Sequence, residues 1–478
     1  MDMKTISDFS KQRGFVYQGS EIYGGLANSW DYGPYGAQLK DNIRALWLRE
    51  FVQKRTDMVQ LDAGILMNPQ VWVASGHVAT FADPLVDCKQ CKTRHRADKL
   101  VEDKKVNAKN PDELDVVTFM KKEMGAAFDP AKMNDGLAAF LAANLNCPNC
   151  GKRDWTAIRS FNLMFKTFQG VTEDSTATVY LRPETAQGIF VNFGNVARTS
   201  RKKVPFGIAQ VGKAFRNEIT PGNFIFRTRE FEQLEIEFFC EPESVKPGEH
   251  LVWHGKWKDA CMKYLTDTLK LDSARLRMRD HSKEELSHYS SATSDIEFLF
   301  PQGWGELWGI ADRTDFDLKA HMKESKQDLS YLDPYTNQKY VPYVIEPSLG
   351  LNRTFLAVLT NAYTEVPAGE EGGTRVVMKF APSLAPVKVA ILPIVKKFSD
   401  LGRELYAELS QHFACEFDEA GNLGKRYYRY DEVGVPFSIA IDPEHWEAGE
   451  VTVRHRDTGL QDVVKRAELV EWIRQRVA

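Results

Sequence analysis

Apolar residues at helical spacing mark the first strong element of the chain. Within Pro34–Arg55 they recur every three to four positions, at Leu39, Ile43, Leu46 and Trp47, which is the repeat of one helix face. We therefore predict an amphipathic helix over 34–55. The next segment, Met58–Pro69, lacks this repeat and ends at a proline, so we predict extended backbone there.

Aromatic and β-branched runs fill the middle of the chain. They predict strands over 204–215, 228–239, 306–318 and 340–346, the last followed by a turn over 347–350 and a helix. A short polar loop joins the first two strands. Antiparallel pairing follows, because parallel strands need a longer crossover.

The strand over 228–239 separates two kinds of side chain. One face is mostly apolar, and the other carries Phe231, Gln233, Glu235 and Glu237. Polar groups buried without partners are costly. This second face therefore either meets water or lines a polar ligand site.

Charged residues around this strand add two candidate anion sites. Arg353 lies in the first turn of the helix after 347–350, and a helix N-terminus attracts anions. Glu346 ends an apolar strand, where a carboxylate needs a partner. The hairpin that leads into the strand over 228–239 carries Arg216, Glu218, Arg227 and Arg229. So many guanidinium groups suit a clamp for a polyanion. The alternative is a solvated hairpin with surface charge.

Composition shifts divide the chain. A charged, Ala- and Lys-rich stretch over 81–155 is interpreted as an insertion, helical in its middle. Ala381–Pro386 is Pro-rich and is interpreted as a linker. After it, strands and helices alternate as 387–393, 400–411, 437–442, 451–456 and 465–476, which predicts a separate α/β domain with parallel strands.

Overall charge restricts the class of protein. The 478 residues contain 62 basic and 66 acidic side chains, which argues against a general nucleic-acid coat protein. A local basic tract over 198–229 nevertheless holds eight Lys or Arg and one acid. No apolar run approaches the about 20 residues of a membrane span, and no signal peptide is evident. We expect a cytoplasmic protein without membrane contact.

Four of the seven cysteines form two C-x-x-C pairs, Cys88 with Cys91 and Cys147 with Cys150. Two such pairs are the ligand set of a structural zinc site. The gap between the pairs is longer than the usual about 15–20 residues. Four reduced cysteines without metal are therefore the alternative.

Together these residues resemble class II aminoacyl-tRNA synthetases. The strings Phe215–Glu218 with Arg227–Phe231 resemble motif 2, Gly350–Arg353 resembles motif 3, and the helix from Pro34 with the segment to Pro69 resembles motif 1. Finer strings are similar to the homodimeric glycyl-tRNA synthetase family, namely Trp30–Gly36, Arg182–Gly188, Gly309–Leu318 and Glu346–Gly350.

The resemblance implies an α+β fold. An antiparallel class II core would comprise 1–80 and 156–380, the insertion 81–155, and an α/β anticodon-binding domain 387–478. The last rests on Gly424–Arg429, Asp431–Phe437 and Thr452–Thr458, where Arg and Tyr suit unstacked bases. It implies glycine, ATP with Mg²⁺, and tRNA(Gly) as partners, in a homodimer.

Site residues carry over by position. Arg216 and Arg353 would be catalytic. The resemblance implies ATP contacts from Arg216, Asn217, Glu218, Phe226, Arg227, Arg229, Phe231, Glu306, Leu307, Gly350 and Arg353. It implies glycine contacts from Arg96, Glu184, Phe231, Gln233, Glu235, Arg313, Glu346, Ser348 and Gly350.

The implied reaction needs no protein nucleophile. The glycine carboxylate attacks the α-phosphate of ATP, and the glycyl group then passes to the tRNA 3′ end. Two alternatives stay open, a class II synthetase for another small amino acid and a non-catalytic synthetase-like accessory protein.

Overall fold

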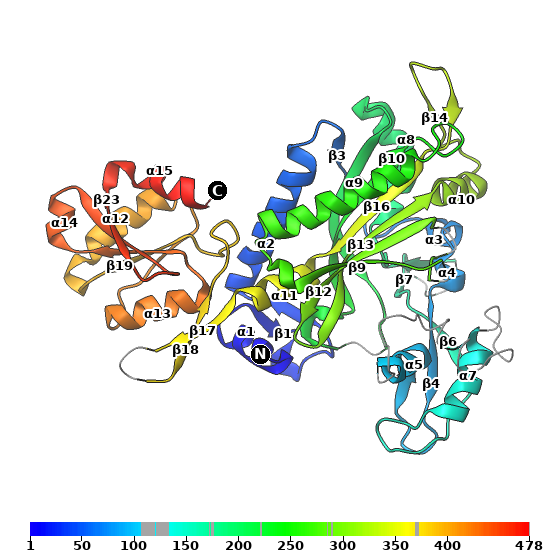
Figure 1. Ribbon diagram of the computed structural model, residues 1–478, viewed down its shortest axis with the longest axis horizontal. Coiled ribbons are helices and arrows are strands. Elements are labelled where there is room, and N and C mark those ends of the chain that lie inside the picture. The colour runs from blue at the N-terminus through cyan, green and yellow to red at the C-terminus, as the bar shows by residue number, and fades with distance from the viewer. Residues whose placement is uncertain are drawn as a thin grey trace.

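A computed structural model describes residues 1–106, 120, 133–171, 173, 176–219, 222–283, 285–287, 290–368 and 372–477. It shows a central region with the C-terminal domain at one end and the insertion at the other (Figure 1). Across these described ranges, no helix combines the length and apolarity that crossing a membrane requires.

A seven-stranded sheet forms the centre. Its pairs are antiparallel except that of β3 with β9, which confirms the predicted antiparallel core. The order is β11 (Leu276–Asp280), β12 (Ala292–Phe300), β13 (Gly303–Thr314), β16 (Tyr343–Gly350), β10 (Glu230–Cys240), β9 (Phe206–Phe215) and β3 (Met58–Gln60).

Helices cover both faces of this sheet. On one face a large apolar core joins Leu234, Ile236 and Phe238 of β10 to α2 (Pro34–Leu48), α9 (Glu249–Lys263) and α11 (Leu351–Ala362). On the other, α8 (Ala186–Ser200) packs on the sheet end through Phe190 and Phe193. The helix predicted over 34–55 is confirmed to residue 53, because a π-helical turn over Arg49–Gln53 continues α2.

Smaller elements surround the core. They are α1 (Met3–Gln12), β1 (Val16–Gln18), β2 (Trp30–Tyr32), α3 (Gln70–Ala74), α4 (His77–Thr80), β7 (Lys166–Phe168), β8 (Thr178–Tyr180), α10 (Phe316–Ser325), β14 (Tyr331–Leu332), β15 (Lys339–Tyr340), β17 (Tyr363–Pro367) and β18 (Thr374–Met378).

Three predictions of local structure differ from the fold. Residues 347–350 are not a turn, because β16 continues to Gly350. Pro347 cannot donate to a neighbouring strand, and the pairing of β16 with β10 skips it between Ser348 and Ile345. The strand predicted to 318 ends at Thr314, whose φ of 54° is left-handed, and α10 begins two residues later. The extended backbone predicted to Pro69 forms a strand only over β3.

The insertion carries a three-stranded antiparallel sheet in the order β5-β4-β6, whose last strand lies over 159–162, beyond the predicted end of the insertion at residue 155. Its elements are β4 (Ala82–Asp87), β5 (Arg94–Arg96), α5 (Ala97–Val106), α7 (Met133–Asn144) and β6 (Arg159–Asn162). Much of the stretch expected to be helical, 107–119 and 121–132, lies outside the described residues.

The C-terminal domain has a five-stranded sheet in the order β20-β19-β21-β22-β23. Only the β19 pairs are parallel, so the expected parallel sheet is mixed. Its elements are β19 (Val389–Pro393), α12 (Ser399–Leu409), β20 (Cys415–Phe417), α13 (Leu423–Val433), β21 (Phe437–Ile441), α14 (Pro443–Glu447), β22 (Glu450–His455), β23 (Gln461–Lys465) and α15 (Arg466–Val477).

The segment interpreted as a linker packs against the core. Leu384 and Ala385 are buried, and the Asn42 side chain of α2 donates to both of their carbonyls, at 3.1 and 2.9 Å. These contacts attach the C-terminal domain firmly to α2.

Candidate active site

A polar cleft of about 330 Å³ lies on the face of the central sheet that carries Phe231, Gln233 and Glu235. Fifteen of the predicted site residues line it, and their roles remain predictions: Glu184, Arg216, Glu218, Phe226, Arg227, Phe231, Gln233, Glu235, Glu306, Leu307, Arg313, Glu346, Ser348, Gly350 and Arg353.

Sheet register brings these distant residues together. Gln233 and Glu235 of β10 stand opposite Gly350 and Ser348 of β16. Side chains of one strand alternate between faces, so matched positions on neighbouring strands share the cleft. The polar face of the predicted strand is therefore the floor of this cleft.

Arginines gather at one end of the cleft. The Arg216 guanidinium carbon lies 5.3 Å from the ring centroids of both Phe81 and Phe231. Arg353 NH1 is 3.1 Å from Glu306 Oε2, and the Arg353 guanidinium lies 4.5 Å from the Phe226 ring centroid. Arg353 lowers the pKa of Glu306. This end offers guanidinium groups and aromatic faces, which suit a nucleotide.

Carboxylates gather at the other end, around Arg313. Arg313 Nε and NH2 donate to the two oxygens of Asp317 at 2.8 and 2.9 Å, and NH1 donates to Glu346 Oε2 at 2.7 Å. Burial raises the pKa of Glu346 to about 8, against the lowering effect of Arg313. The excess of acceptors suits a small cation such as an ammonium group.

Glu184 at this end is held ionised by its neighbours. His77 Nε2 lies 3.3 Å from Glu184 Oε2, and Gln187 donates to Glu184 Oε1 at 3.0 Å. Burial alone would raise the pKa of Glu184, but His77 and then Arg313 hold it below its usual value. An anionic Glu184 is ready to accept from a cation.

Gln233 connects two further cleft residues. Its side-chain nitrogen lies 3.3 Å from Glu235 Oε1 and 3.2 Å from Ser348 Oγ. The Thr185 hydroxyl donates to Glu235 Oε2. These bonds fix the orientation of the carboxylate of Glu235 at the floor of the cleft.

Three predicted residues do not line the cleft. Asn217 is held through its backbone, whose N–H donates to the Leu163 carbonyl at 2.8 Å. Arg229 donates to the carbonyls of Glu218 and Ala27 at 3.1 and 2.9 Å, so it braces the clamp. Arg96 lies 3.9 Å from Glu218, at the nucleotide end rather than beside the acids around Arg313.

Five residues of this neighbourhood are not among the predicted site residues. His77 and Asp317 contact Glu184 and Arg313, as described above. Glu237 is fully buried, and oxygens of Glu235, Glu237 and Glu346 lie within 4.8 Å of one another. Its place on the polar face was a usable signal. His281 and Asp295, joined at 2.7 Å, line the nucleotide end and carried no motif.

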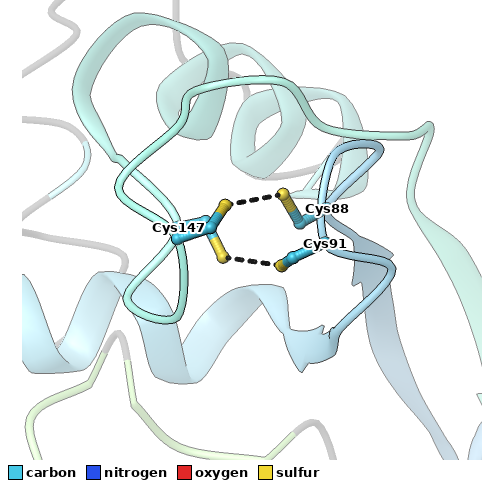
Figure 2. A group of neighbouring side chains, drawn as sticks. Cys88, Cys91 and Cys147 are labelled. Carbon is cyan, nitrogen blue, oxygen red and sulfur yellow. Dashed lines mark hydrogen bonds between the residues drawn. The ribbon is translucent and has the colours of Figure 1, made fainter.

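The four predicted cysteine ligands meet at the edge of the insertion. Their sulfurs all lie within 4.8 Å of one another. Cys88 Sγ is 3.6 Å from Cys150 Sγ, and Cys91 Sγ is 3.7 Å from Cys147 Sγ (Figure 2). Tetrahedral zinc with bonds of about 2.3 Å places sulfurs about 3.8 Å apart. The donor set and its spacing therefore fit zinc.

A second groove, of about 620 Å³, lies between the N-terminal segment and α13. Exposed Lys425, Tyr428 and Arg429 of α13 line it with Arg13 and Tyr17. Other basic residues of the C-terminal domain do not reach this surface. Arg426, Arg454 and Arg456 are buried, and Arg454 binds Asp431 at 2.9 Å.

Comparison with known proteins assigns three regions. Residues 167–362 match the tRNA synthetase class II core domain (G, H, P, S and T), residues 83–139 match glycyl-tRNA synthetase insertion domain 1, and residues 388–476 match the anticodon binding domain.

Curated relatives align over nearly the whole chain. A glycine–tRNA ligase from Acetivibrio thermocellus is 56% identical, covering 98% of this chain and 97% of the relative. One from Clostridium beijerinckii is 57% identical, with 98% and 97% covered. One from Geobacillus thermodenitrificans is 55% identical, with 100% and 98% covered.

Proposed function

The chain belongs to the glycine–tRNA ligase family, and from that premise we propose how its cleft performs the reaction. The enzyme activates glycine with ATP and transfers the glycyl group to tRNA. The observation that carries the assignment of roles is the difference between two parts of one cleft: guanidinium groups lie against aromatic rings in one, and several carboxylates surround a single guanidinium in the other. Arg216 and Arg353 lie at one end and the acids around Arg313 at the other.

Activation requires two anions to approach each other. The glycine carboxylate attacks the α-phosphate, so the protein must orient both and stabilise the charge that develops. Arg216 lies on the same face as Phe231 and is assigned to bridge the carboxylate and the α-phosphate. Phe231 stacks on adenine, and Glu218 accepts from its amino group.

The remaining nucleotide contacts follow from position. Arg353 packs against the side of adenine opposite Phe231 or reaches the γ-phosphate, and Arg227 holds the outer phosphates. Glu306 binds the Mg²⁺ that accompanies ATP, since magnesium prefers carboxylate and phosphate oxygens. In the structure Glu306 pairs with Arg353, so ATP with its ion would replace this contact.

Glycine binds at the acidic end. Glu184, Glu235 and Glu346 accept from its ammonium group, while Gln233 and Ser348 close the pocket. The support is the excess of carboxylates, of which Glu235 is buried and Glu184 and Glu346 are partly buried, over the single guanidinium of Arg313. A pocket without spare room excludes larger amino acids by steric clash.

The groove at α13 is assigned to the anticodon end of the tRNA. Lysine and arginine contact phosphates, and exposed tyrosines stack on unpaired bases. Tyr428 is 41% exposed, and its ring already lies 4.4 Å from the Arg375 guanidinium. A cytoplasmic location accords with this substrate and with the free thiols of all seven cysteines.

We propose a homodimer and a structural zinc ion as further features. The loop between β1 and β2 exposes Ile22 at 88% and Tyr23 at 87%, and a second copy of the chain would cover them. Zinc would be held by the cysteine cluster and stabilise the insertion.

Glycine-dependent ATP–pyrophosphate exchange tests the assignment. Arg216→Ala should lower the rate by at least a hundredfold, because the arginine stabilises charge in the transition state. The matched control Arg198→Ala, on the exposed end of α8, should leave it unchanged. Exchange driven by serine or alanine but not by glycine would favour a synthetase for another small amino acid, and an inactive wild-type protein would favour an accessory role.

A further inference from the structure

Residues within or directly beside the sheet of the insertion contact each of Arg216, Asn217 and Glu218. The Phe81 ring lies 5.3 Å from the Arg216 guanidinium. The Asn217 N–H donates to the Leu163 carbonyl at 2.8 Å, and the Leu163 N–H donates to the Phe81 carbonyl at 3.0 Å. Phe81 directly precedes β4 and Leu163 directly follows β6. The insertion therefore supports the backbone that carries the proposed nucleotide contacts.

The guanidinium of Arg96 on β5 stands among three carboxylates. Its Nε and NH2 bind the two oxygens of Asp98 at 3.2 and 2.6 Å. Its NH1 lies 3.1 Å from Asp83 Oδ1 and 3.9 Å from Glu218 Oε2. Arg227 also acts on Asp83 and lowers its pKa, but Arg96 is the cation within ion-pair distance of all three carboxylates, so acceptors outnumber donors here.

Two of these acceptors are buried and unsatisfied. Asp83 and Glu218 are only 5% and 9% exposed. Asp83 Oδ2 and Glu218 Oε2 have no hydrogen-bond partner within the described part of the chain. Such oxygens are costly until a donor meets them. Burial also raises the pKa of Asp83 to about 6. Glu218 lines the cleft, so a ligand can supply that donor.

We propose that the Asp83–Arg96 pair of the insertion positions Glu218 to accept from the 6-amino group of adenine. This inference rests on the proposed role of Glu218. Asp98 binds one edge of the Arg96 guanidinium. Asp83 binds NH1 of Arg96 and so keeps it from pairing with Glu218. Without Asp83, NH1 pairs with Glu218 and competes with the adenine. The insertion thus contributes to the selection of ATP, and Asp83 is a positioning residue.

The test compares ATP with purine riboside triphosphate, which lacks the 6-amino group, in glycine-dependent pyrophosphate exchange. The wild type should prefer ATP. Asp83→Asn should reduce this preference about tenfold, the worth of one hydrogen bond to a charged acceptor. The change should appear as a higher KM for ATP, with the KM for glycine and for the analogue unchanged. Arg96→Lys, which keeps the charge but loses the fork, should act in the same direction.

Two further variants separate the possible results. Glu218→Gln should lose the preference, and adding Asp83→Asn to it should change nothing more, because residues that act as one unit are not additive. Asp87→Asn is the matched control, since Asp87 lies on the same strand and pairs with Arg94 at 2.8 Å; it should keep the preference.

Each contrary result has one meaning. An unchanged preference in Glu218→Gln would overturn the proposed role of Glu218. If Glu218→Gln loses the preference for ATP while Asp83→Asn and Arg96→Lys both keep it, this inference alone would be overturned. An equal loss toward ATP, analogue and glycine in the Asp83 and Arg96 variants would reduce the pair to a structural role and also overturn it.

Discussion

Arg313 reaches Glu346 from a β-bulge. The register of β13 with β16 pairs Asp312 with Ile345 and then Thr314 with Val344, so Arg313 is the extra residue. Bulges redirect side chains beside active sites. Here Arg313 is directed so that NH1 lies 2.7 Å from Glu346 Oε2 while Asp317 binds its other side.

Loss of this guanidinium should weaken both glycine binding and folding. Arg313→Gln leaves the buried Asp317 and the partly buried Glu346 without their cation, which should cost about 3 kcal/mol of unfolding free energy. The KM for glycine should rise at least tenfold. Denaturant unfolding and pyrophosphate exchange measure the two effects. Arg277→Gln, which breaks a more exposed pair with Glu297 at 2.5 Å, should change stability by less than about 0.5 kcal/mol.

The acids of the cleft predict a pH dependence of stability. Burial and then the charge of Glu346 raise the pKa of Glu237 well above 4.5, and burial raises that of Glu346 to about 8. The folded state therefore binds more protons between pH 4.5 and 8, so its stability falls as pH rises through this window.

Glu237→Gln removes one of these groups while keeping its shape. At pH 8 to 9 the variant should be more stable than the wild type, because it lacks a buried group whose ionisation the folded state disfavours. Its stability should vary less with pH. Urea unfolding across pH 5 to 9 measures this, and a parallel, unshifted curve would contradict the assignment.

Metal analysis tests the cysteine cluster. Protein purified without added zinc should contain about one zinc ion per chain, because the four sulfurs lie within 4.8 Å of one another and two of their separations, 3.6 and 3.7 Å, match a tetrahedral site. Cys147→Ser should lower the zinc content and destabilise the insertion. Cys415→Ser, outside the cluster, should keep the ion. Wild-type protein free of zinc would identify the cluster as four reduced thiols.

Two helical glycines predict opposite outcomes on substitution. A Cβ on Gly36 of α2 would lie 1.8 Å from the Phe15 carbonyl oxygen, whereas a Cβ on Gly255 of α9 meets nothing within 4 Å. Gly36→Ala should destabilise the protein by several kcal/mol, since backbone must move. Gly255→Ala should stabilise it by about 0.5–1 kcal/mol. Thermal unfolding of both variants decides this.

The groove at α13 predicts an effect on tRNA alone. Lys425→Ala and Tyr428→Ala should each raise the KM for tRNA several-fold and leave pyrophosphate exchange unchanged, because base stacking contributes about 1–3 kcal/mol. Binding should weaken as salt rises. Lys397→Ala, on another exposed part of the domain, is the control. If all three variants changed the KM for tRNA equally, the groove would not be part of the tRNA interface.

Local pattern was sufficient for some of the site. The period of two over 228–239 correctly separated the apolar side of β10 from the polar side that floors the cleft. The motifs around Arg216 and Arg353 supplied part of the lining, including both of those arginines. The same local view mistook residues 347–350 for a turn, because the Pro-Ser-Leu-Gly string is typical of turns and the neighbouring strands that extend β16 are far away in sequence.

The sequence by itself determined the kinds of element and the kinds of chemistry: a polar strand face, guanidinium groups for anions, and two cysteine pairs. Periodicity and residue type act between chain neighbours, so a single sequence shows them. Only the tertiary structure decided that a bulge aims Arg313 at Glu346, that Arg454 and Arg456 are buried, and that the insertion places Asp83 and Arg96 beside Glu218. Those contacts depend on strand register and domain packing, which are set by residues distant along the chain.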